Sequence, residues 1–190
     1  MKYSLTLITG NENKFREIKN FLSNYNIELE KIDLDINEIQ SENLEEIILD
    51  FIQKAYKMLK KPVIAEDSGL FIRSLKGFPG PYSSYVYKTL GNEGILKLME
   101  GIDDRYAEFK CALAYKDEEN EKVFLGISAG YISEKIKGKG WGFDPIFIPK
   151  GSNITFGEMN IEEKNKYSHR GKSLSLFVNW FSENYLKKSS

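Results

Sequence analysis

Hydrophobic and polar positions follow two different periods along this chain, and each period predicts a type of element. In the first third, continuous apolar runs alternate with segments whose apolar residues recur every three or four positions. The predicted elements are a strand at 3–8, a helix through 15–22, a strand at 27–34, a helix at 43–60 and a strand at 62–66. The order β-α-β-α-β is typical of a mostly parallel sheet with covering helices.

The second half of the chain shows strict strand-type alternation instead. Two apolar sets flank the turn at 117–120: Ala107, Phe109, Cys111, Leu113 and Tyr115, then Val123, Leu125, Ile127, Ala129 and Tyr131. Alternation on both sides of a polar turn predicts a long antiparallel hairpin. A turn-rich loop at 77–81, a short helix at 93–99 and a C-terminal helix at about 172–186 complete an α/β prediction.

Composition narrows the class of protein. A chain of 190 residues is expected to form one domain, and 27 basic against 28 acidic residues argues against nucleic-acid or membrane partners. No apolar run approaches the roughly 20 residues of a membrane helix, and the N-terminus is too strand-like for a signal peptide. Cys111 is the only cysteine, which excludes an internal disulfide or a thiolate zinc site. We therefore expect a cytoplasmic globular protein.

The first candidate site is the segment Thr9-Gly10-Asn11-Glu12-Asn13-Lys14, between a predicted strand and a helix. Such a corner points free N–H groups and the positive end of a helix dipole at one place, which suits phosphate. Gly10 permits close approach, and Lys14 supplies a positive charge. The alternative is an asparagine N-cap with a surface lysine, which the hexapeptide taken alone favours.

The second candidate site is a set of acids, Glu38, Glu66 and Asp67. Carboxylates at the rim of a sheet are suitable ligands for Mg²⁺, and Asp67 could also act as a base toward water. The alternative is a turn aspartate that caps the next segment. A further acidic set lies off the apolar stripe of its helix and is interpreted as a solvated face: Glu42, Glu45, Glu46 and Asp50.

Two further segments carry candidate chemistry. Gly140-Trp141-Gly142-Phe143-Asp144-Pro145 offers aromatic walls for a planar ring, or an ordinary turn with aromatic packing. His169, the only histidine, stands beside Arg170, and both are donors able to reach a base carbonyl. An incidental histidine in a solvated basic stretch is the alternative.

Together and in this order, the motifs resemble those of the inosine triphosphate pyrophosphatase family, the Ham1-like purine nucleotide pyrophosphatases. The resemblance covers nearly the whole chain and is carried by TGNENK (9–14), AEDSGL (65–70), GFPGPYS (77–83), GWGFDPIF (140–147) and EEKNKYSHRGKSL (162–174). It implies one two-lobed α/β domain over residues 1–190, with a mixed sheet and a central cleft. It also implies a homodimer and the Mg²⁺-dependent hydrolysis of ITP, dITP and XTP to the monophosphate and pyrophosphate.

The resemblance also assigns roles to residues. Asp67 would be the proton acceptor and a metal ligand, helped by Glu38, although Ser41 stands where the family has glycine. The substrate-binding set would be Thr9, Gly10, Asn11, Glu12, Asn13, Lys14, Lys54, Ser68, Trp141, Gly142, Phe143, Asp144, Lys164, His169 and Arg170. Of these, residues 9–14 would bind the phosphates, 141–144 would frame the base, and Lys164, His169 and Arg170 would complete the nucleoside end.

The expected mechanism follows from these roles. Asp67 would hold Mg²⁺ and activate the water that attacks the α-phosphorus. Donors from His169 or Arg170 would meet the 6-carbonyl of the base, where adenine carries an amino group, and such sites can reject the analogue by ~10⁴-fold. The rivals are a Maf-like nucleotide pyrophosphatase with other base preferences, and a non-catalytic nucleotide sensor or nucleic-acid-binding module.

Overall fold

The computed structural model describes residues 3–186 and has one mixed seven-stranded sheet in the order β2-β1-β3-β5-β6-β7, with β4 paired to β3. β1 runs parallel to β2 and β3, whereas the neighbouring pairs β3–β5, β5–β6 and β6–β7 are antiparallel. The strands are β1 (Tyr3–Ile8), β2 (Ile27–Ile32), β3 (Val63–Ile72), β4 (Pro79–Gly80), β5 (Tyr106–Lys116), β6 (Glu121–Ile132) and β7 (Phe147–Pro149). The α-helices are α1 (Glu12–Leu22), α2 (Leu44–Leu59), α3 (Ser83–Thr89), α4 (Gly91–Leu98), α5 (Ile161–Tyr167) and α6 (His169–Phe181).

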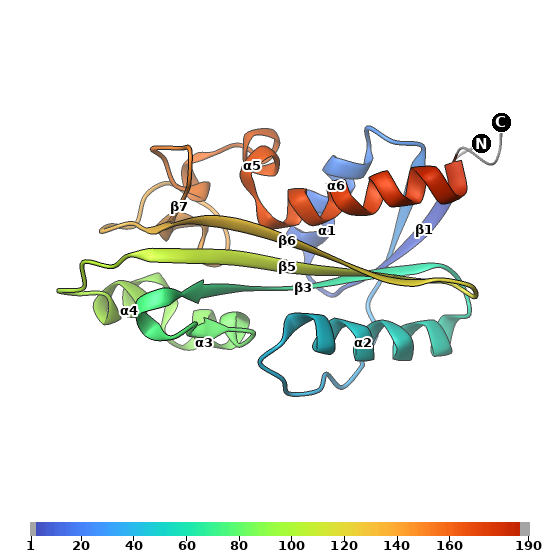
Figure 1. The fold of residues 1–190 in the computed structure, drawn as a ribbon, viewed down its shortest axis with the longest axis horizontal. Helices are drawn as coiled ribbons and strands as arrows, with labels where there is room; N and C mark the ends of the chain where they lie inside the picture. The colour runs from blue at the N-terminus through green and yellow to red at the C-terminus, as the bar shows by residue number, and fades with distance from the viewer. Residues whose placement is uncertain (1–2, 187–190) are drawn as a thin grey trace.

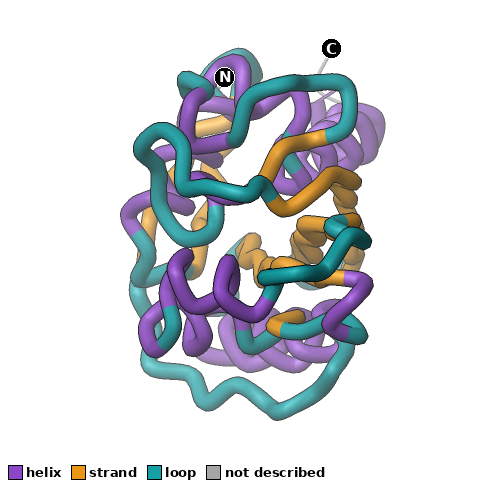
Figure 2. Tube along the Cα trace, turned by 90° about the vertical axis from the view of Figure 1, so that its left-hand side faces the viewer, coloured by secondary structure: helices purple, strands orange, loops and turns teal. Residues whose placement is uncertain are grey.

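Helices cover both faces of this sheet. Figure 1 shows the long strands β3, β5 and β6 along the molecule, with α1, α5 and α6 on one face and α2, α3 and α4 on the other. The view turned by 90° places the strands between these two layers (Figure 2). Three hydrophobic clusters fill the layers: one under α1 and α6, one under α2, and one beside α4 at the far end of the ribbon.

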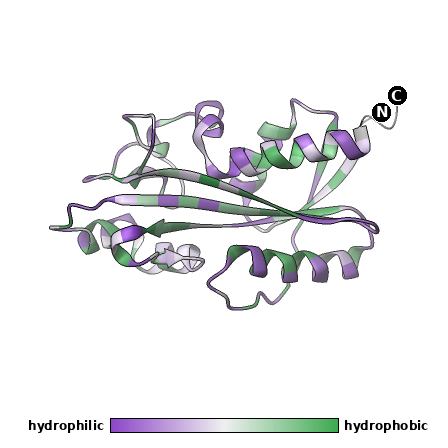
Figure 3. Ribbon diagram, in the orientation of Figure 1, coloured by the Kyte–Doolittle hydropathy of each residue, from purple (hydrophilic) through white to green (hydrophobic). Residues whose placement is uncertain are grey.

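The fold class predicted from the sequence is confirmed. The first third has the order β-α-β-α-β, and α2 buries its apolar stripe against the strands (Figure 3). The long antiparallel hairpin is present as β5 and β6, with Asp117 Oδ1 accepting hydrogen bonds from two backbone N–H groups of the turn. No helix within residues 3–186 has the length and apolar character needed to cross a bilayer.

The predicted end of the third strand at residue 66 is wrong, because β3 continues to Ile72. Its partner β5 pairs with it over the whole length, so that Asp67 lies opposite Ala112 in mid-strand rather than at a strand tip. Sequence reasoning placed the end where acidic residues appeared. Glu66 nevertheless fits inside the sheet because cations from other elements neutralise it, as described below.

β6 alternates between buried and exposed positions, but its buried positions are not those of the predicted apolar set. Ile127 and Tyr131 are exposed, at 37% and 48%, whereas the buried positions include Gly126 and Ser128. A Cβ atom at Gly126 would lie 2.0 Å from the carbonyl oxygen of His169. The missing side chain therefore lets the first turn of α6 approach the strand.

Three helices differ from the prediction. α3 and α5 were not predicted at all, although α5 carries Lys164. α6 begins at His169, three residues before the predicted start, because the Ser168 hydroxyl caps it by accepting a hydrogen bond from the Gly171 N–H. The helix is followed by a π-helical turn over Ser182–Leu186.

Candidate active site

A cavity of about 860 Å³ opens where one edge of β3 lacks a neighbouring strand. β1 ends at Ile8 and pairs with β3 only as far as Ile64, while β4 begins to pair at Leu70. The stretch of β3 between these two pairings therefore faces the cavity with Asp67, Ser68 and Gly69. The crevice beyond the end of a parallel strand is a usual ligand site of α/β folds.

The corner between β1 and α1 forms one wall of this cavity. The Asn11 side chain caps α1 by accepting hydrogen bonds from the N–H groups of Asn13 and Lys14, so the N-cap interpretation is confirmed. The interpretation of Lys14 as a surface residue is wrong: its side chain is 19% exposed and its ammonium group lies 3.2 Å from Glu66. Burial would lower the pKa of Lys14, but Glu66 and Asp67 together hold it above its usual value.

Asp67 and Glu38 face the same cavity. Burial raises the pKa of Asp67 to about 6, against the attraction of Lys14, and the negative charges of Glu66 and Glu38 contribute to the rise. Asp67 Oδ1 accepts a hydrogen bond from the Ser68 N–H at 2.9 Å. A carboxylate with a pKa near neutrality can accept a proton at physiological pH.

These two carboxylates fit a magnesium ion that also binds substrate phosphates. Within residues 3–186, no three side chains of the types that bind metals gather closely enough to hold an ion by themselves. Mg²⁺ is usually held by one or two carboxylates together with phosphate oxygens and water. The donor set of Glu38 and Asp67 is therefore suited to an ion completed by the substrate.

Behind the cavity, Arg170 joins two buried carboxylates. Its guanidinium donates to Glu66 Oε1 through two nitrogens, at 3.2 and 3.1 Å, and to Glu17 Oε2 at 2.5 Å. A fourth bond reaches the Ser68 hydroxyl at 3.1 Å. Burial opposes ionisation of Glu66, but the charges of Arg170 and Lys14 lower its pKa below the usual range. Arginine has five N–H donors, so four are already committed within the protein.

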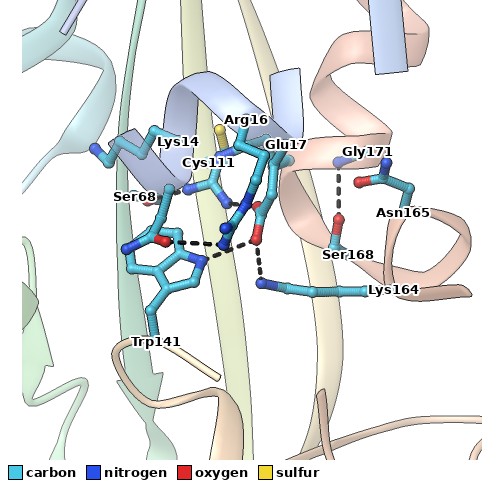
Figure 4. Close-up of polar contacts among 12 residues, drawn as sticks. Lys14, Arg16, Glu17, Ser68, Cys111, Trp141, Lys164, Asn165, Ser168 and Gly171 are labelled. Atoms are coloured by element: carbon cyan, nitrogen blue, oxygen red, sulfur yellow. Dashed lines mark hydrogen bonds and ion pairs between the residues drawn. The ribbon is translucent and has the colours of Figure 1, made fainter. Parts of the chain in front are cut away.

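The same network continues from Glu17 to the aromatic loop. The Lys164 ammonium lies 2.6 Å from both Glu17 and Asp144, and the Trp141 indole N–H donates to Glu17 at 2.9 Å. Figure 4 shows Trp141 and Lys164 converging on Glu17 from different elements. Burial opposes the ionisation of Glu17, yet Arg170 and Lys164 lower its pKa to about 2.

Part of the cavity wall is aromatic. Trp141 and Phe143 line it together with His169, whose ring stacks on Phe109 at 4.6 Å between centroids and 9° between planes. His169 is 3% exposed, and its Nδ1 is buried without a hydrogen-bond partner among the described residues. Burial, and then the charges of Arg170 and Lys164, lower the pKa of His169 well below its usual value, so the ring is neutral.

The cavity gathers most of the residues to which the family resemblance assigns roles. Fourteen of them line it: Thr9, Gly10, Asn11, Asn13, Lys14, Glu38, Asp67, Ser68, Trp141, Gly142, Phe143, Asp144, His169 and Arg170. Three do not. Glu12 is exposed and pairs with Lys31, Lys54 binds the Asn37 carbonyl and Asp50 outside the cavity, and Lys164 lies behind the wall in the ion network. In the structure, the side chains of these three residues contact other groups of the protein and do not line the cavity.

Sequence reasoning missed Glu17 altogether. It lies one position before Ile18 on the buried side of α1, and at 4% exposure it is the acid on which three donors converge. An acidic residue beside the apolar stripe of an amphipathic helix was the available signal. Its partners lie more than 120 residues away in the chain, so no local pattern could have identified them.

The buried ion network predicts a loss of stability in acid. Since Glu17 and Glu66 have lower pKa values in the folded than in the unfolded state, they stabilise the fold above their unfolded pKa and lose that contribution as the pH falls. We expect the free energy of unfolding to decrease as the pH falls from 4.5 to about 2, by about 3 kcal/mol for Glu17 alone. Urea unfolding at a series of pH values measures this, and Glu17→Gln should flatten the slope. A profile unchanged by that substitution would contradict the assignment.

An α/β fold with a cavity at a strand–helix corner, lined by charged and aromatic side chains, is typical of a nucleotide-binding class of protein. The Ham1 family model matches residues 5–180, and the chain belongs to the Ham1 family, as the sequence motifs predicted. It is 50% identical to the dITP/XTP pyrophosphatase of Saccharolobus solfataricus over 183 residues, covering 96% of this chain and 95% of the relative. It is also 50% identical to the dITP/XTP pyrophosphatase of Methanopyrus kandleri, over 93% and 95% of the two chains. The fold is similar to the structure of the Staphylococcus aureus Ham1 protein, with a TM-score of 0.83, 29% identity and coverage of 95% and 98%.

Proposed function

We propose that this protein hydrolyses non-standard purine nucleoside triphosphates, among them ITP, dITP and XTP, to the monophosphate and pyrophosphate. The observation that carries the proposal is one cavity lined by Asp67 and Glu38, by residues of the corner at 9–14, and by Trp141 with His169. A triphosphate and a purine base need these two kinds of surface, charged and aromatic, in one site. The relatives named dITP/XTP pyrophosphatase support the substrate class.

The broader class is settled. The chain is an enzyme, a hydrolase acting on nucleoside triphosphates, and that prediction is confirmed by its family and its relatives. The Maf-like alternative loses its support, because the matching family is Ham1. A non-catalytic sensor or a nucleic-acid-binding module is likewise disfavoured.

The proposed mechanism assigns each wall a task. The corner at Thr9–Lys14 binds the phosphate chain through the positive end of the α1 dipole and the Lys14 ammonium. Asp67 accepts a proton from the water that attacks the α-phosphorus, for which a pKa of about 6 is suited. Glu38 and Asp67 would hold Mg²⁺, which when bound neutralises phosphate charge and stabilises the leaving pyrophosphate.

Glu66 has a different role from that of Asp67, the proposed base. Held between Arg170 and Lys14 at 1% side-chain exposure, it stays ionised and fixes both cations. Its negative charge also contributes to the raised pKa of Asp67. Glu66 is thus a positioning residue, and Asp67 remains the proposed base.

We propose His169 as the donor that reads the 6-carbonyl of the base. Of the two donors suggested by the sequence, Arg170 is largely occupied by carboxylates, whereas His169 lines the cavity with a neutral ring. A neutral imidazole carries one N–H, which can donate to hypoxanthine or xanthine and would face the amino group of adenine.

Replacing His169 by phenylalanine tests this assignment. The variant keeps an aromatic ring against Phe109 and removes the nitrogen, so the fold should persist. We expect the ratio of kcat/KM for ITP to that for ATP to fall at least about 10-fold, because a buried hydrogen bond to the correct base is lost. Steady-state pyrophosphate release with both nucleotides measures the ratio, and an unchanged value would remove His169 from base recognition.

The proposed function is tested by pyrophosphate release from ITP, dITP and XTP against the four standard NTPs and dUTP, with Mg²⁺ and with EDTA. We expect release from the three non-standard purine nucleotides, abolished by EDTA and restored by Mg²⁺. Comparable release from ATP and GTP, or none from ITP and XTP, would refute the proposal. A salt-sensitive gel shift without hydrolysis would favour nucleic-acid binding instead.

We further propose, from the family resemblance, that the protein is one domain of two lobes, that it forms a homodimer and that it acts in the cytoplasm. Sedimentation equilibrium at micromolar concentrations tests the dimer, and cell fractionation tests the location. A monomer over that whole concentration range would count against the dimer.

A further inference from the structure

We propose that Lys88 of α3 is a substrate-binding residue whose ammonium group binds an anionic part of the nucleotide. The inference rests on the proposed function and adds to it a residue from the wall of the cavity opposite α1. Neither the motifs of the sequence nor the ion network points to this lysine. Its position in the cavity does.

One face of α3 is turned to the cavity. Ser84, Tyr87 and Lys88 all line it, and their spacing of three and four residues places them on the same side of a helix. Tyr87 packs edge-on against Phe143 of the aromatic loop, with 5.5 Å between ring centroids. This face of α3 therefore forms part of the cavity wall and contacts the aromatic loop.

The helix is held firmly in this orientation. The Ser83 hydroxyl accepts a hydrogen bond from the Leu70 N–H of β3 at 2.8 Å and donates one to the Gly80 carbonyl at 2.7 Å. Val86 is 5% exposed and packs in the hydrophobic cluster beside α4. Because α3 is anchored on its other side, Lys88 has a defined place in the wall although its own side chain is exposed.

Lys88 differs from the other cations that line the cavity, because it is not paired with a carboxylate of the described residues. Two other cations line the cavity, and each is bound to a carboxylate: Lys14 to Glu66, and Arg170 to Glu66 and Glu17. Lys88 makes no ion pair or hydrogen bond with any part of the chain that the structure describes. Glu38 and Asp67 add negative charge to the same space. A nucleoside triphosphate carries several negative charges, so an uncommitted ammonium group in the wall is a binding group for it.

Two parts of the substrate present anionic oxygens. One is the triphosphate chain, common to all the nucleotides. The other is the base of XTP, because xanthine loses a ring proton near neutral pH, whereas the hypoxanthine of ITP remains neutral. Comparison of ITP with XTP therefore shows whether Lys88 binds the triphosphate chain or the ionised base.

The test is the kinetics of Lys88→Ala with both nucleotides, beside Lys88→Arg and the control Lys97→Ala. Lys97 is an exposed lysine of the next helix that does not line the cavity. We expect Lys88→Ala to raise KM about 5- to 20-fold with kcat changed less than about twofold, since binding rather than chemistry is affected. Lys88→Arg should restore most of the affinity, and Lys97→Ala should match the wild type.

Each pattern of results has a distinct meaning. An equal rise in KM for ITP and XTP assigns Lys88 to the triphosphate. A rise confined to XTP, disappearing at acidic pH where xanthine is neutral, assigns it to the base. KM values for both nucleotides that remain at the wild-type level overturn the proposal.

Failure of the proposed function would be seen separately, as a wild-type protein that releases no pyrophosphate from either nucleotide. In that case calorimetric titration of the wild-type and Lys88→Ala proteins with ITP and XTP measures binding without turnover. Equal affinities in the two proteins would refute the role of Lys88.

Discussion

Replacing Asp67 by asparagine should lower the rate of pyrophosphate release from ITP by at least about 1000-fold while the protein remains folded. The change removes both a proton acceptor, which typically contributes about 10²- to 10⁴-fold, and a proposed metal ligand. Asparagine is nearly isosteric and can still accept the hydrogen bond from the Ser68 N–H. The loss should appear in kcat and should not be rescued by additional substrate.

The stability of the Asp67→Asn protein provides a second readout. Burial raises the pKa of Asp67, so above that pKa the ionised carboxylate destabilises the metal-free folded state relative to the unfolded chain. A neutral amide avoids this unfavourable contribution, and we expect the free energy of unfolding at pH 7 to rise by about 3 kcal/mol without metal. Asp103→Asn, at an exposed position outside the cavity, is the control for both measurements. Near-normal turnover by Asp67→Asn would end the assignment of Asp67 as the base.

Replacing Arg170 by alanine should cause the largest loss of stability, about 3–5 kcal/mol, since the substitution leaves buried carboxylates without their main counter-charge. Glu66 and Glu17 would lose the guanidinium that lies within 3.2 Å of both. Urea unfolding at pH 7 measures the effect. Arg73→Ala is a matched control, because Arg73 also makes two hydrogen bonds to one carboxylate, Asp104, but at an exposed site. That control should leave the free energy of unfolding nearly unchanged.

A further variant distinguishes the loss of a counter-charge from a simple loss of packing. If the destabilisation comes from unpaired carboxylates, adding Glu17→Gln to Arg170→Ala should restore part of the stability, since one uncompensated charge disappears. If the two effects simply add, the cavity left by the arginine side chain is the main cause. The ratio of ITP to ATP hydrolysis by Arg170 variants is interpretable only after this measurement, because the substitution destabilises the fold itself.

The sequence predicted well those features that depend on neighbouring residues. The apolar stripe of α2 and the alternating strands β5 and β6 were identified because their periods are visible within short windows. The end of β3 was misjudged because an acidic pair usually marks a turn, and only its pairing with β5 keeps residues 67–72 in the sheet. Similarly, the small residues of β6 gave no signal of burial until α6 was seen to lie against Gly126.

From the sequence alone, only those parts of the candidate site that lie in short linear motifs could be identified. Thr9–Lys14, Asp67, Trp141 and His169 were selected because short segments carry their chemistry, and the fold brings them to one cavity. Glu17 and Lys88 were missed, since nothing near them in the chain marks a buried acid or a cavity-facing lysine. Lys54 and Glu12 were selected by resemblance and lie outside the cavity, where Asp50 and Lys31 pair with them.

The sequence by itself determined the α/β class, the β-α-β-α-β order of the first third, the long hairpin and the family, because periodicity and motif order are properties of the linear chain. The tertiary structure alone decided which charges are buried and which donors are free. Arg170 and Glu17 lie 153 positions apart, and they are buried in ionised form because they pair with each other and with Glu66 and Lys164 respectively. The cavity exists for a similar reason: β1 stops at Ile8 while β3 continues, and the edge that remains open is a property of the sheet and of no single segment.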